Sequence, residues 1–242
     1  GSPFDRYYYD GAGQRVEVPQ EESERTKIEV AREAVLGLID QLGEDDRLGI
    51  VTFNDKARTL RPLAYVDRRN LAAARNAVQN LRAGGGTNMD AGMEQAAELY
   101  DEYLVYSPDE YENRVIFITD AMPNLGETNR YGLLGMTERN ADARLHTTFI
   151  GVGVDFNTQL IDYISGIRGA NYYAVHSPGE FNRRLDAEFD YMVTPLVFDL
   201  ELRVESSGWE IETVYGSPQA DIASGSLMRV NTLFPSERSG GE

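Results

Sequence analysis

The most restrictive feature of this sequence is a short apolar run that ends at an acidic residue. Val115 to Thr119 are all apolar or β-branched, and Asp120 follows directly. Because the run is short and is bounded by Arg114 and Pro123, it predicts a strand buried on both faces of a parallel sheet. Open α/β sheets bind ligands beyond the carboxyl ends of their strands, so Asp120 is a candidate ligand-binding residue. The alternative is that Asp120 only caps the turn in the segment Asp-Ala-Met-Pro-Asn.

Strand-like and helix-like segments alternate along most of the chain. The apolar periodicity predicts helices over residues 28–42, 71–81, 89–104, 130–143, 160–167 and 181–192, and strands over residues 47–53, 57–63, 115–119, 145–152 and 170–175. This alternation predicts an α/β fold with a parallel sheet that is covered by helices on both faces.

The two ends of the chain depart from this pattern. Residues 4–18 contain two β-prone runs around a glycine-containing turn, which predicts a hairpin. Beyond Thr194-Pro195 no helix is predicted, and the strand-like segments are residues 196–204, 209–215 and 226–234. We therefore expect an α/β domain over residues 1–193, with the hairpin as an insertion, and a partial β-rich module over residues 194–242.

Composition excludes several classes of function. The formal net charge is −17 at pH 7, which argues against a nucleic-acid partner because phosphate binding requires clusters of basic side chains. The sequence has no cysteine, which excludes disulfides, thiolate zinc sites and cysteine nucleophiles. No apolar run approaches the roughly 20 residues that span a bilayer, so we expect no transmembrane segment in this sequence. The chain begins at Gly1 rather than Met and ends at Glu242 soon after a strand-like run, so we expect both ends to continue in a longer protein.

A glycine-rich loop provides a second candidate for ligand binding. Gly84-Gly85-Gly86-Thr87-Asn88 joins the end of one predicted helix to the start of the next. Thr87 and Asp120 would present a hydroxyl and a carboxylate at the same edge of the sheet, and such hard oxygen ligands suit Mg²⁺ or Mn²⁺. The glycines would let the backbone approach closely at that edge. The alternative is structural, with Thr87 as the N-cap of the second helix and the glycines as the C-cap of the first.

Several segments together resemble one known family. They are AGGGTNMDAGM and NRVIFITDAMPN, preceded by DDRLGIVTFNDKARTLRPL and followed by LHTTFIGVGVDFN and ANYYAV. Over about residues 20–193, in the same order, they are similar to the von Willebrand factor A domain. The resemblance implies a doubly wound, Rossmann-like α/β fold with a metal-ion-dependent adhesion site. In that family the metal is held by a DxSxS motif, a threonine and an aspartate, and Thr87 and Asp120 match the last two.

The departures from the family pattern affect the metal site. The first strand and the aspartate of the DxSxS motif are absent from this sequence, and Ala121 replaces the glycine that commonly follows the aspartate. Ser2 stands where the last serine of the motif would be, although a cloning remnant explains Gly1-Ser2 equally well. We therefore expect bound Mg²⁺ or Mn²⁺ in the full-length parent protein, and weak or absent affinity in these residues alone.

The resemblance implies a binding module in which an acidic group of a partner protein completes the coordination of the metal. The candidate partner-binding residues are Tyr7, Tyr8, Tyr9, Asn88 and Asn124. Alternatively, the three tyrosines pack on a neighbouring element. Two other functions compete, a structural scaffold with a vestigial metal site and a metal-dependent hydrolase.

Enzymatic activity is disfavoured by the absence of nucleophile and phosphate motifs. The sequence contains neither GxxxxGK[ST] nor GxSxG, so we expect no enzyme and no catalytic residues. The tail after residue 194 resembles the β-rich region of bacterial and archaeal family members that are secreted or tethered to membranes. Together with the acidic composition, this resemblance favours a prokaryotic protein outside the cytoplasm.

Overall fold

The computed structural model describes residues 7–9, 14–104, 111–122, 132–153, 158–177, 179, 189, 191–205, 207–208, 211–215 and 220–235. Its elements in chain order are β1 (Tyr7–Tyr9), β2 (Arg15–Glu17), α1 (Gln20–Ser23), α2 (Lys27–Gln41), β3 (Arg47–Phe53), β4 (Ala57–Tyr65), α3 (Arg68–Gln79), α4 (Met89–Glu98), α5 (Asp101–Leu104), β5 (Asn113–Thr119), α6 (Leu133–Asp142), β6 (Leu145–Val152), α7 (Thr158–Gly166), β7 (Asn171–Val175), β8 (Val197–Arg203), η1 (Ile222–Ser224) and β9 (Ser226–Leu233). The predicted helix over residues 181–192 lies mostly outside the described residues.

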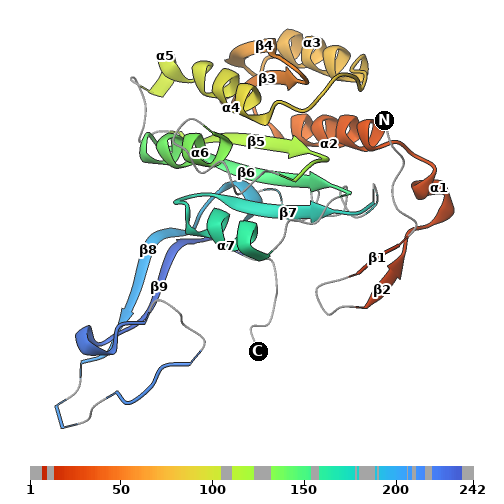
Figure 1. Ribbon diagram of the computed structural model, residues 1–242. Coiled ribbons are helices and arrows are strands. Elements are labelled where there is room, and N and C mark those ends of the chain that lie inside the picture. The colour runs from red at the N-terminus through yellow and green to blue at the C-terminus, as the bar shows by residue number, and fades with distance from the viewer. Residues whose placement is uncertain are drawn as a thin grey trace.

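Strands β5, β6 and β7 form a parallel sheet at the centre of the molecule (Figure 1). Val115 of β5 lies opposite Thr147 of β6, and Ile150 of β6 lies opposite Tyr173 of β7. β6 is buried at every position, as expected for an inner strand whose two faces are both covered. In β5, alternate side chains point to opposite faces of the sheet, which explains its uninterrupted apolar sequence.

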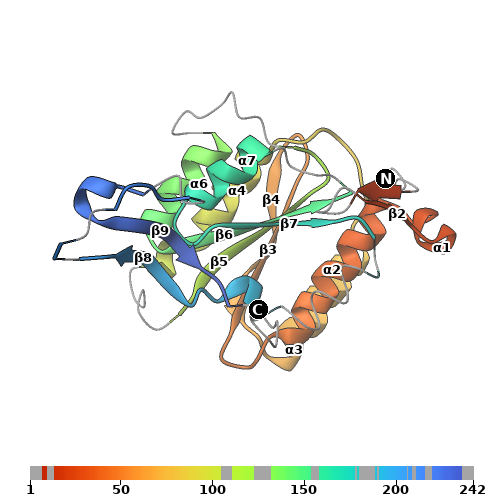
Figure 2. The same cartoon turned by 90° about the horizontal axis from the view of Figure 1, so that it is seen from below.

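Helices cover both faces of this sheet (Figure 2). On one face, α4, α6 and α7 pack around Phe117 and Phe149. On the other face, α2 packs through Val30, Ala34 and Leu38. Fully burying one such aliphatic or aromatic side chain stabilises a fold by about 1.5–3 kcal/mol, so these two layers make the core of the protein. The predicted α/β fold with a parallel sheet and helices on both faces is confirmed.

The hairpin β3–β4 forms a separate antiparallel pair, with Phe53 opposite Ala57. It packs on α2 and α3 through Ile39, Ile50 and Val78. In the described part of the chain, β3 pairs only with β4, and β5 pairs only with β6. Therefore one edge of β3 and one edge of β5 have no partner strand among the described residues. The strands β3 to β7 form two sheets, β3–β4 and β5–β6–β7.

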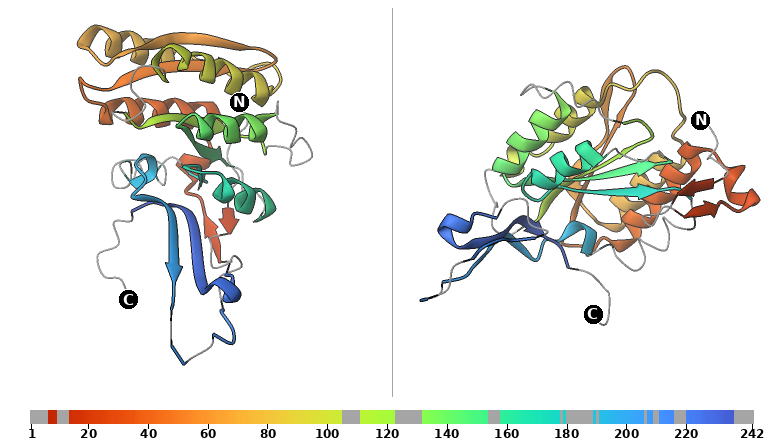
Figure 3. Two further views of the ribbon diagram at one scale, coloured as in Figure 1. Left: turned by 90° about the vertical axis from the view of Figure 1, so that its left-hand side faces the viewer. Right: turned by 60° about the horizontal axis from the view of Figure 1, so that its bottom comes forward.

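Two further hairpins lie at the ends of the described chain. β1 and β2 pair antiparallel, as predicted for residues 4–18, and β8 pairs antiparallel with β9. The β8–β9 hairpin extends away from the helical layers (Figure 3). The predicted strand over residues 209–215 is wrong for residues 211–215, which belong to no strand. The reason is that β8 pairs directly with β9, so this stretch lies outside the ladder, and Tyr215 is 89% exposed.

A buried polar cluster joins the β8–β9 hairpin to the amino ends of β5 and β6. The guanidinium of Arg114 donates to the Gly169 carbonyl at 2.9 Å and to the carboxylate of Glu112 at 2.9 Å. Burial lowers the pKa of Arg114, and the negative charge of Glu112 opposes that shift. His146 Nδ1 lies 2.8 Å from the same carboxylate, and its ring packs on Phe198 of β8 with centroids 5.1 Å apart. The hairpin is thus packed on the end of the sheet opposite to Asp120.

None of the helices in the described ranges is both long enough and apolar enough to cross a membrane.

Candidate metal centre

Strand β5 carries Asp120 to the carboxyl edge of the parallel sheet. Thr119, the last residue of β5, is buried, whereas Asp120 is exposed. The backbone N–H of Ala121 donates to Thr119 Oγ1 at 3.1 Å, so the hydroxyl of Thr119 stabilises the turn that follows the strand. The carboxylate of Asp120 has no hydrogen bond or ion pair with any other described residue. The turn-cap interpretation of Asp120 therefore finds no support within the described residues.

The glycine-rich loop places Thr87 directly before helix α4. Asn88, not Thr87, is the N-cap of that helix, because Asn88 Oδ1 accepts from the backbone N–H of Ala91 at 3.0 Å. The interpretation of Thr87 as the N-cap is therefore wrong, since the helix begins one residue later than that interpretation requires. Thr87 is exposed, and its hydroxyl has no hydrogen bond with any other described residue.

The turn between β3 and β4 holds the glycine-rich loop in place. Asp55 Oδ1 accepts from the backbone N–H of Gly86 at 2.9 Å, and the carbonyl of Asn54 accepts from the backbone N–H of Asn88 at 2.7 Å. A Cβ at Gly86 would lie 2.5 Å from Asp55 Oδ1, and Gly85 has φ +80°. Gly86 is therefore favoured by the close approach of this turn, and Gly85 by its left-handed backbone, whereas a Cβ at Gly84 would meet nothing within 4 Å.

One aromatic ring, that of Phe53, packs on both α4 and β5, the elements that adjoin Thr87 and Asp120. The ring of Phe53, at the end of β3, stacks on Phe117 of β5 with centroids 5.0 Å apart. The same ring packs on Gly92 of α4, where an added Cβ would lie 2.8 Å from Phe53 Cδ1. Figure 1 shows the first turn of α4 on the side of the molecule to which β5 points. The structure thus brings the two loops to one end of the α/β core.

The hairpin β1–β2 borders the same edge on the side of β7. The ring of Tyr8 stacks on His176, which follows β7, with centroids 4.3 Å apart. Tyr7 is 44% exposed, and the guanidinium of Arg15 lies over its ring at 4.2 Å. One tyrosine of the run therefore packs on a neighbour, and another faces outward. The side chain of Tyr9 lies outside the described residues.

Ser2 and Asn124 also lie outside the described residues, so the structure places neither of them relative to Thr87 and Asp120. The residues that the sequence did not single out are Asn54 and Asp55. Their signal was the turn sequence Asn-Asp after the strand ending at Phe53, but nothing local indicated that this turn contacts the Thr87 loop.

The donor atoms at this edge fit a hard divalent cation in part. A hydroxyl and a carboxylate are suitable oxygen ligands for Mg²⁺ or Mn²⁺. Within the described ranges, no group of three or more histidine, aspartate or glutamate side chains is arranged to hold a metal ion. Thr87 and Asp120 therefore provide two of the several ligands that such an ion requires, and a site built on them alone would be weak.

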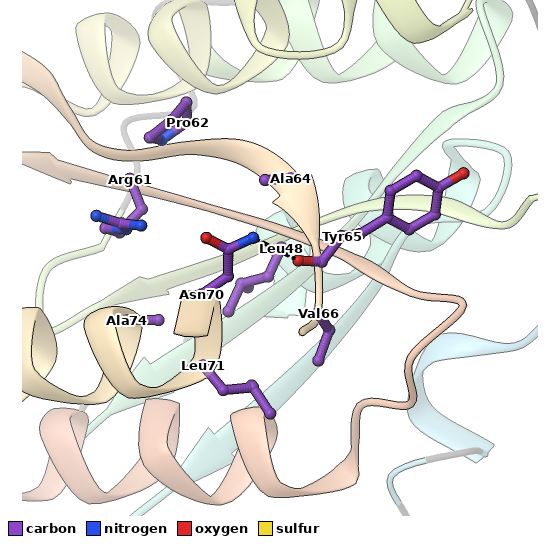
Figure 4. Close-up of a pocket in the computed structure, with 9 residues that line it drawn as sticks. All are labelled: Leu48, Arg61, Pro62, Ala64, Tyr65, Val66, Asn70, Leu71 and Ala74. Atoms are coloured by element: carbon purple, nitrogen blue, oxygen red, sulfur yellow. Dashed lines mark hydrogen bonds between the residues drawn. The ribbon is translucent and has the colours of Figure 1, made fainter. Parts of the chain in front are cut away.

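The cavity drawn in Figure 4 does not provide an alternative site. It lies between β4 and α3, is lined by residues such as Leu48, Pro62 and Ala74, and has a volume of about 10 Å³. Asn70 Nδ2 donates to the carbonyl of Tyr65 beside it at 2.9 Å. This volume holds about one water molecule, which is too small for a substrate.

Comparison with known proteins identifies a family. The model of the von Willebrand factor type A domain matches residues 21–186. The chain is 28% identical to the uncharacterized protein sll0103 of Synechocystis sp. over 63% of this chain and 34% of that protein. It is 24% identical to human inter-alpha-trypsin inhibitor heavy chain H4 over 76% of this chain and 20% of that protein. The matched region thus spans about a third and a fifth of these relatives.

A similar fold is found among solved structures. The structure of a von Willebrand factor type A protein from Catenulispora acidiphila aligns with a TM-score of 0.58 and 24% identity, over 74% of this chain and 41% of that chain.

Proposed function

The chain belongs to the von Willebrand factor type A domain family, and from that premise we propose that it is a protein-binding module whose ligand site is the edge formed by Thr87 and Asp120. A divalent cation, Mg²⁺ or Mn²⁺, is held at this edge, and an acidic group of the partner protein completes its coordination. The proposed activity is binding without turnover.

One observation carries this proposal. The hydroxyl of Thr87 and the carboxylate of Asp120, 33 residues apart in the chain, are both exposed, and neither has a hydrogen bond with another described residue. Exposed polar side chains that take no part in a cap or turn are solvated and remain available to a ligand. Here Asn88 provides the cap and Thr119 the turn, which leaves the hydroxyl of Thr87 and the carboxylate of Asp120 for a ligand.

The charges of these two residues explain why an acidic partner fits. A bound divalent cation would supply a Lewis-acidic centre for a carboxylate. Asp120 would contribute one negative charge, whereas Thr87 would contribute a neutral hydroxyl. The positive charge of the cation would therefore be only partly neutralised, and an acidic side chain would be attracted to it despite the net charge of −17 of the whole chain.

The hairpin β1–β2 contributes partner selectivity in this proposal. Stacking on His176 fixes Tyr8, so the hairpin has a defined position beside the edge. Tyr7 and Arg15 form a partly exposed aromatic–cation pair on it. Tyrosine and arginine are enriched at binding hot spots because they bury large areas and form directional hydrogen bonds. Deletion of the hairpin is expected to weaken partner binding and to leave metal binding unchanged.

Metal binding is tested by Mn²⁺ electron paramagnetic resonance, which detects weak sites through loss of the free-ion signal. We expect weak binding by the wild-type chain, and we expect this binding to be lost in Asp120→Ala. Thr87→Val, which keeps the shape and removes the hydroxyl, should weaken binding, whereas Thr87→Ser should preserve it. The matched control is Asp142→Ala, because Asp142 is an exposed carboxylate at the far end of α6. Equal binding by Asp120→Ala and Asp142→Ala would refute the proposed metal centre.

Partner chemistry is tested with a displayed peptide library. Panning on the immobilised chain in Mn²⁺ should enrich peptides with an essential Asp or Glu, and EDTA should release them. Replacing that residue by Asn or Gln should abolish capture. Enrichment of peptides that bind equally well in EDTA would instead favour a protein-binding surface that uses no metal.

A structural scaffold with a vestigial metal site is the competing function. It is favoured by the small number of ligands that the described residues provide. In that case neither Mn²⁺ nor Mg²⁺ would change the thermal unfolding temperature, and Asp120→Ala would match the wild type. A bound ion, by contrast, stabilises the folded state by RT ln(1 + c/Kd), where c is the concentration of the free ion, so the unfolding temperature would rise with the ion concentration.

A further inference from the structure

One of the two lysines of this chain lies at the carboxyl edge of the parallel sheet. The sequence has 40 acidic and 23 basic residues, but its only lysines are Lys27 and Lys56. Lys27 is the first residue of α2, and its Nζ donates to the carbonyl of Gly153 at 3.3 Å. Gly153 directly follows β6, so this contact places the ammonium group at the end of the middle strand of the sheet.

The register of the strands places this ammonium group near Asp120. Thr119 of β5 lies opposite Gly151 of β6, so Asp120 is level with the residue before Gly153. Neighbouring strands are about 4.8 Å apart, so the ammonium group of Lys27 lies within roughly 12 Å of the backbone of Asp120. Figure 1 shows the start of α2 on the side of the molecule to which β5 and β6 point.

The carboxylates of the first turns of α2 are engaged by groups other than Lys27. Glu29 accepts from the backbone N–H and from the hydroxyl of Thr26, both at 2.7 Å, and these hydrogen bonds lower its pKa. Glu33 forms an ion pair with Arg25. Lys27 itself has no ion pair with any residue that the structure describes. Within this part of the protein, its positive charge is therefore not neutralised, although the chain as a whole has a net charge of −17.

Stacked aromatic rings lie beyond Lys27 on the same edge. The backbone N–H of Gly153 donates to the carbonyl of Val175 at 2.7 Å, and His176 follows Val175 directly. The ring of His176 stacks on that of Tyr8, on the side of β6 that faces away from β5. From β5 to β7 the edge therefore presents a carboxylate, an ammonium group and a pair of aromatic rings, in that order.

We propose that Lys27 binds a second acidic residue of the partner protein, two positions from the acidic residue that completes the metal site. The ammonium group has three N–H donors, and the carbonyl of Gly153 uses one of them. Side chains at alternate positions of an extended peptide lie on one face, about 7 Å apart, so two acidic side chains are able to reach both Lys27 and the edge at Asp120. This inference rests on the proposed metal-dependent binding function, because the metal places the first acidic residue.

The first test determines the preference of the chain at each position of a peptide. The probe is a synthetic library of nonapeptides with a fixed central Asp, captured in Mn²⁺ by the immobilised chain of 242 residues. We expect the wild type to enrich Asp or Glu two positions from the fixed residue. Lys27→Arg should keep this preference, Lys27→Gln should lose it, and Lys27→Glu should enrich Lys or Arg at that position instead.

A matched control makes the same change of charge elsewhere. Arg69 is an exposed residue in the first turn of α3, and it has no hydrogen bond or ion pair with another described residue. Arg69→Gln and Arg69→Glu should therefore show the preference of the wild type. A peptide with both acidic residues should bind the wild type about 3- to 5-fold more tightly than Lys27→Gln, as expected for one exposed ion pair. Salt should reduce this difference, because it screens exposed charges.

The competing role of Lys27 is purely structural, as a contact between α2 and the end of β6. In that case Lys27→Gln would lower the temperature of thermal unfolding, and the peptide preference of the folded variant would equal that of the wild type. Circular dichroism establishes that each variant is folded. An unchanged preference in Lys27→Gln or in Lys27→Glu would overturn the proposal.

The second test requires no metal. Because the chain has only two lysines, acylation with an N-hydroxysuccinimide ester followed by mass spectrometry reports on Lys27, with Lys56 as the internal reference. In EDTA, a peptide that contains Asp-Gly-Asp should slow the acylation of Lys27 more than that of Lys56, and the matching Asn-Gly-Asn peptide should slow neither. Absence of Mn²⁺-dependent capture by the wild type would refute the proposed metal centre, and the acylation rates would still decide the role of Lys27. Equal slowing at both lysines would overturn that role.

Discussion

Replacing Gly169 by alanine tests how closely the β8–β9 hairpin and the parallel sheet are packed together. Gly169 follows α7, has φ +69°, and its carbonyl accepts from Arg114. Its N–H donates to Thr232 Oγ1 of β9 at 2.7 Å, so its backbone bonds to both parts of the protein. A Cβ at this position would lie 2.2 Å from His146 Cδ2.

Two contributions determine the expected loss of stability. A non-glycine residue in left-handed backbone costs about 1–2 kcal/mol. The overlap with the His146 ring adds about 1–3 kcal/mol, the usual cost of overpacking a core. The ring is 4% exposed and is held by Glu112 and Phe198, so it has no free space to move into. We expect Gly169→Ala to lower the free energy of unfolding by about 2–5 kcal/mol.

A matched control separates the two contributions. Gly208 also has positive φ, +92°, but an added Cβ there would meet nothing within 4 Å. Gly208→Ala should therefore cost only the backbone contribution, about 1–2 kcal/mol. The measurement is urea unfolding followed by tryptophan fluorescence and circular dichroism. Combining Gly169→Ala with His146→Ala should recover part of the overlap energy. Equal losses in Gly169→Ala and Gly208→Ala, or no coupling between positions 169 and 146, would refute the described packing.

Two further predictions concern charged groups. Arg114→Met should lower the free energy of unfolding by about 3–5 kcal/mol, because the carboxylate of Glu112 and the carbonyl of Gly169 would both lose the buried guanidinium that donates to them. Urea unfolding measures this loss of stability. A loss below about 1 kcal/mol would contradict the prediction. Hydrogen bonds from Arg203, and then other groups, lower the pKa of Glu201 from 4.5 to about 2. Because the folded pKa is the lower one, Glu201 stabilises the β8–β9 hairpin above pH 4.5, and this contribution is lost as the pH falls towards 2. A carboxyl titration by NMR should show this midpoint in the wild type, and a midpoint near 4.5 would contradict it.

Local sequence was sufficient to predict the elements that carry the candidate site. The residues from Val115 to Thr119 are all apolar or β-branched because helices cover both faces of β5. Burial on both faces therefore produces an uninterrupted run that is visible in the sequence. The position of Asp120 at the end of that strand followed from the same run. The glycines before Thr87 were also visible, and their close contact with a neighbouring turn confirmed the expectation that the backbone approaches closely there.

Some local predictions failed because a different residue or strand met the same requirement. Asn88 rather than Thr87 caps α4, since both residue types are good caps and only the start of the helix distinguishes them. Residues 211–215 have strand-like composition, but β8 and β9 pair with each other and leave no edge position for them. Propensity shows that a segment is able to form a strand, whereas a partner strand decides whether it does.

The sequence by itself determined the fold class, the family and the two loops that carry Thr87 and Asp120, because periodic burial and loop composition are local properties. Only the tertiary structure showed which contacts connect distant segments of the chain. Asp55 reaches Gly86 across 31 residues, and Asp90 reaches Leu133 across 43 residues. A hydrogen bond between distant segments depends on how helices and turns pack in three dimensions, and a single carboxylate on a helix looks the same in sequence whether it faces water or caps a neighbouring helix.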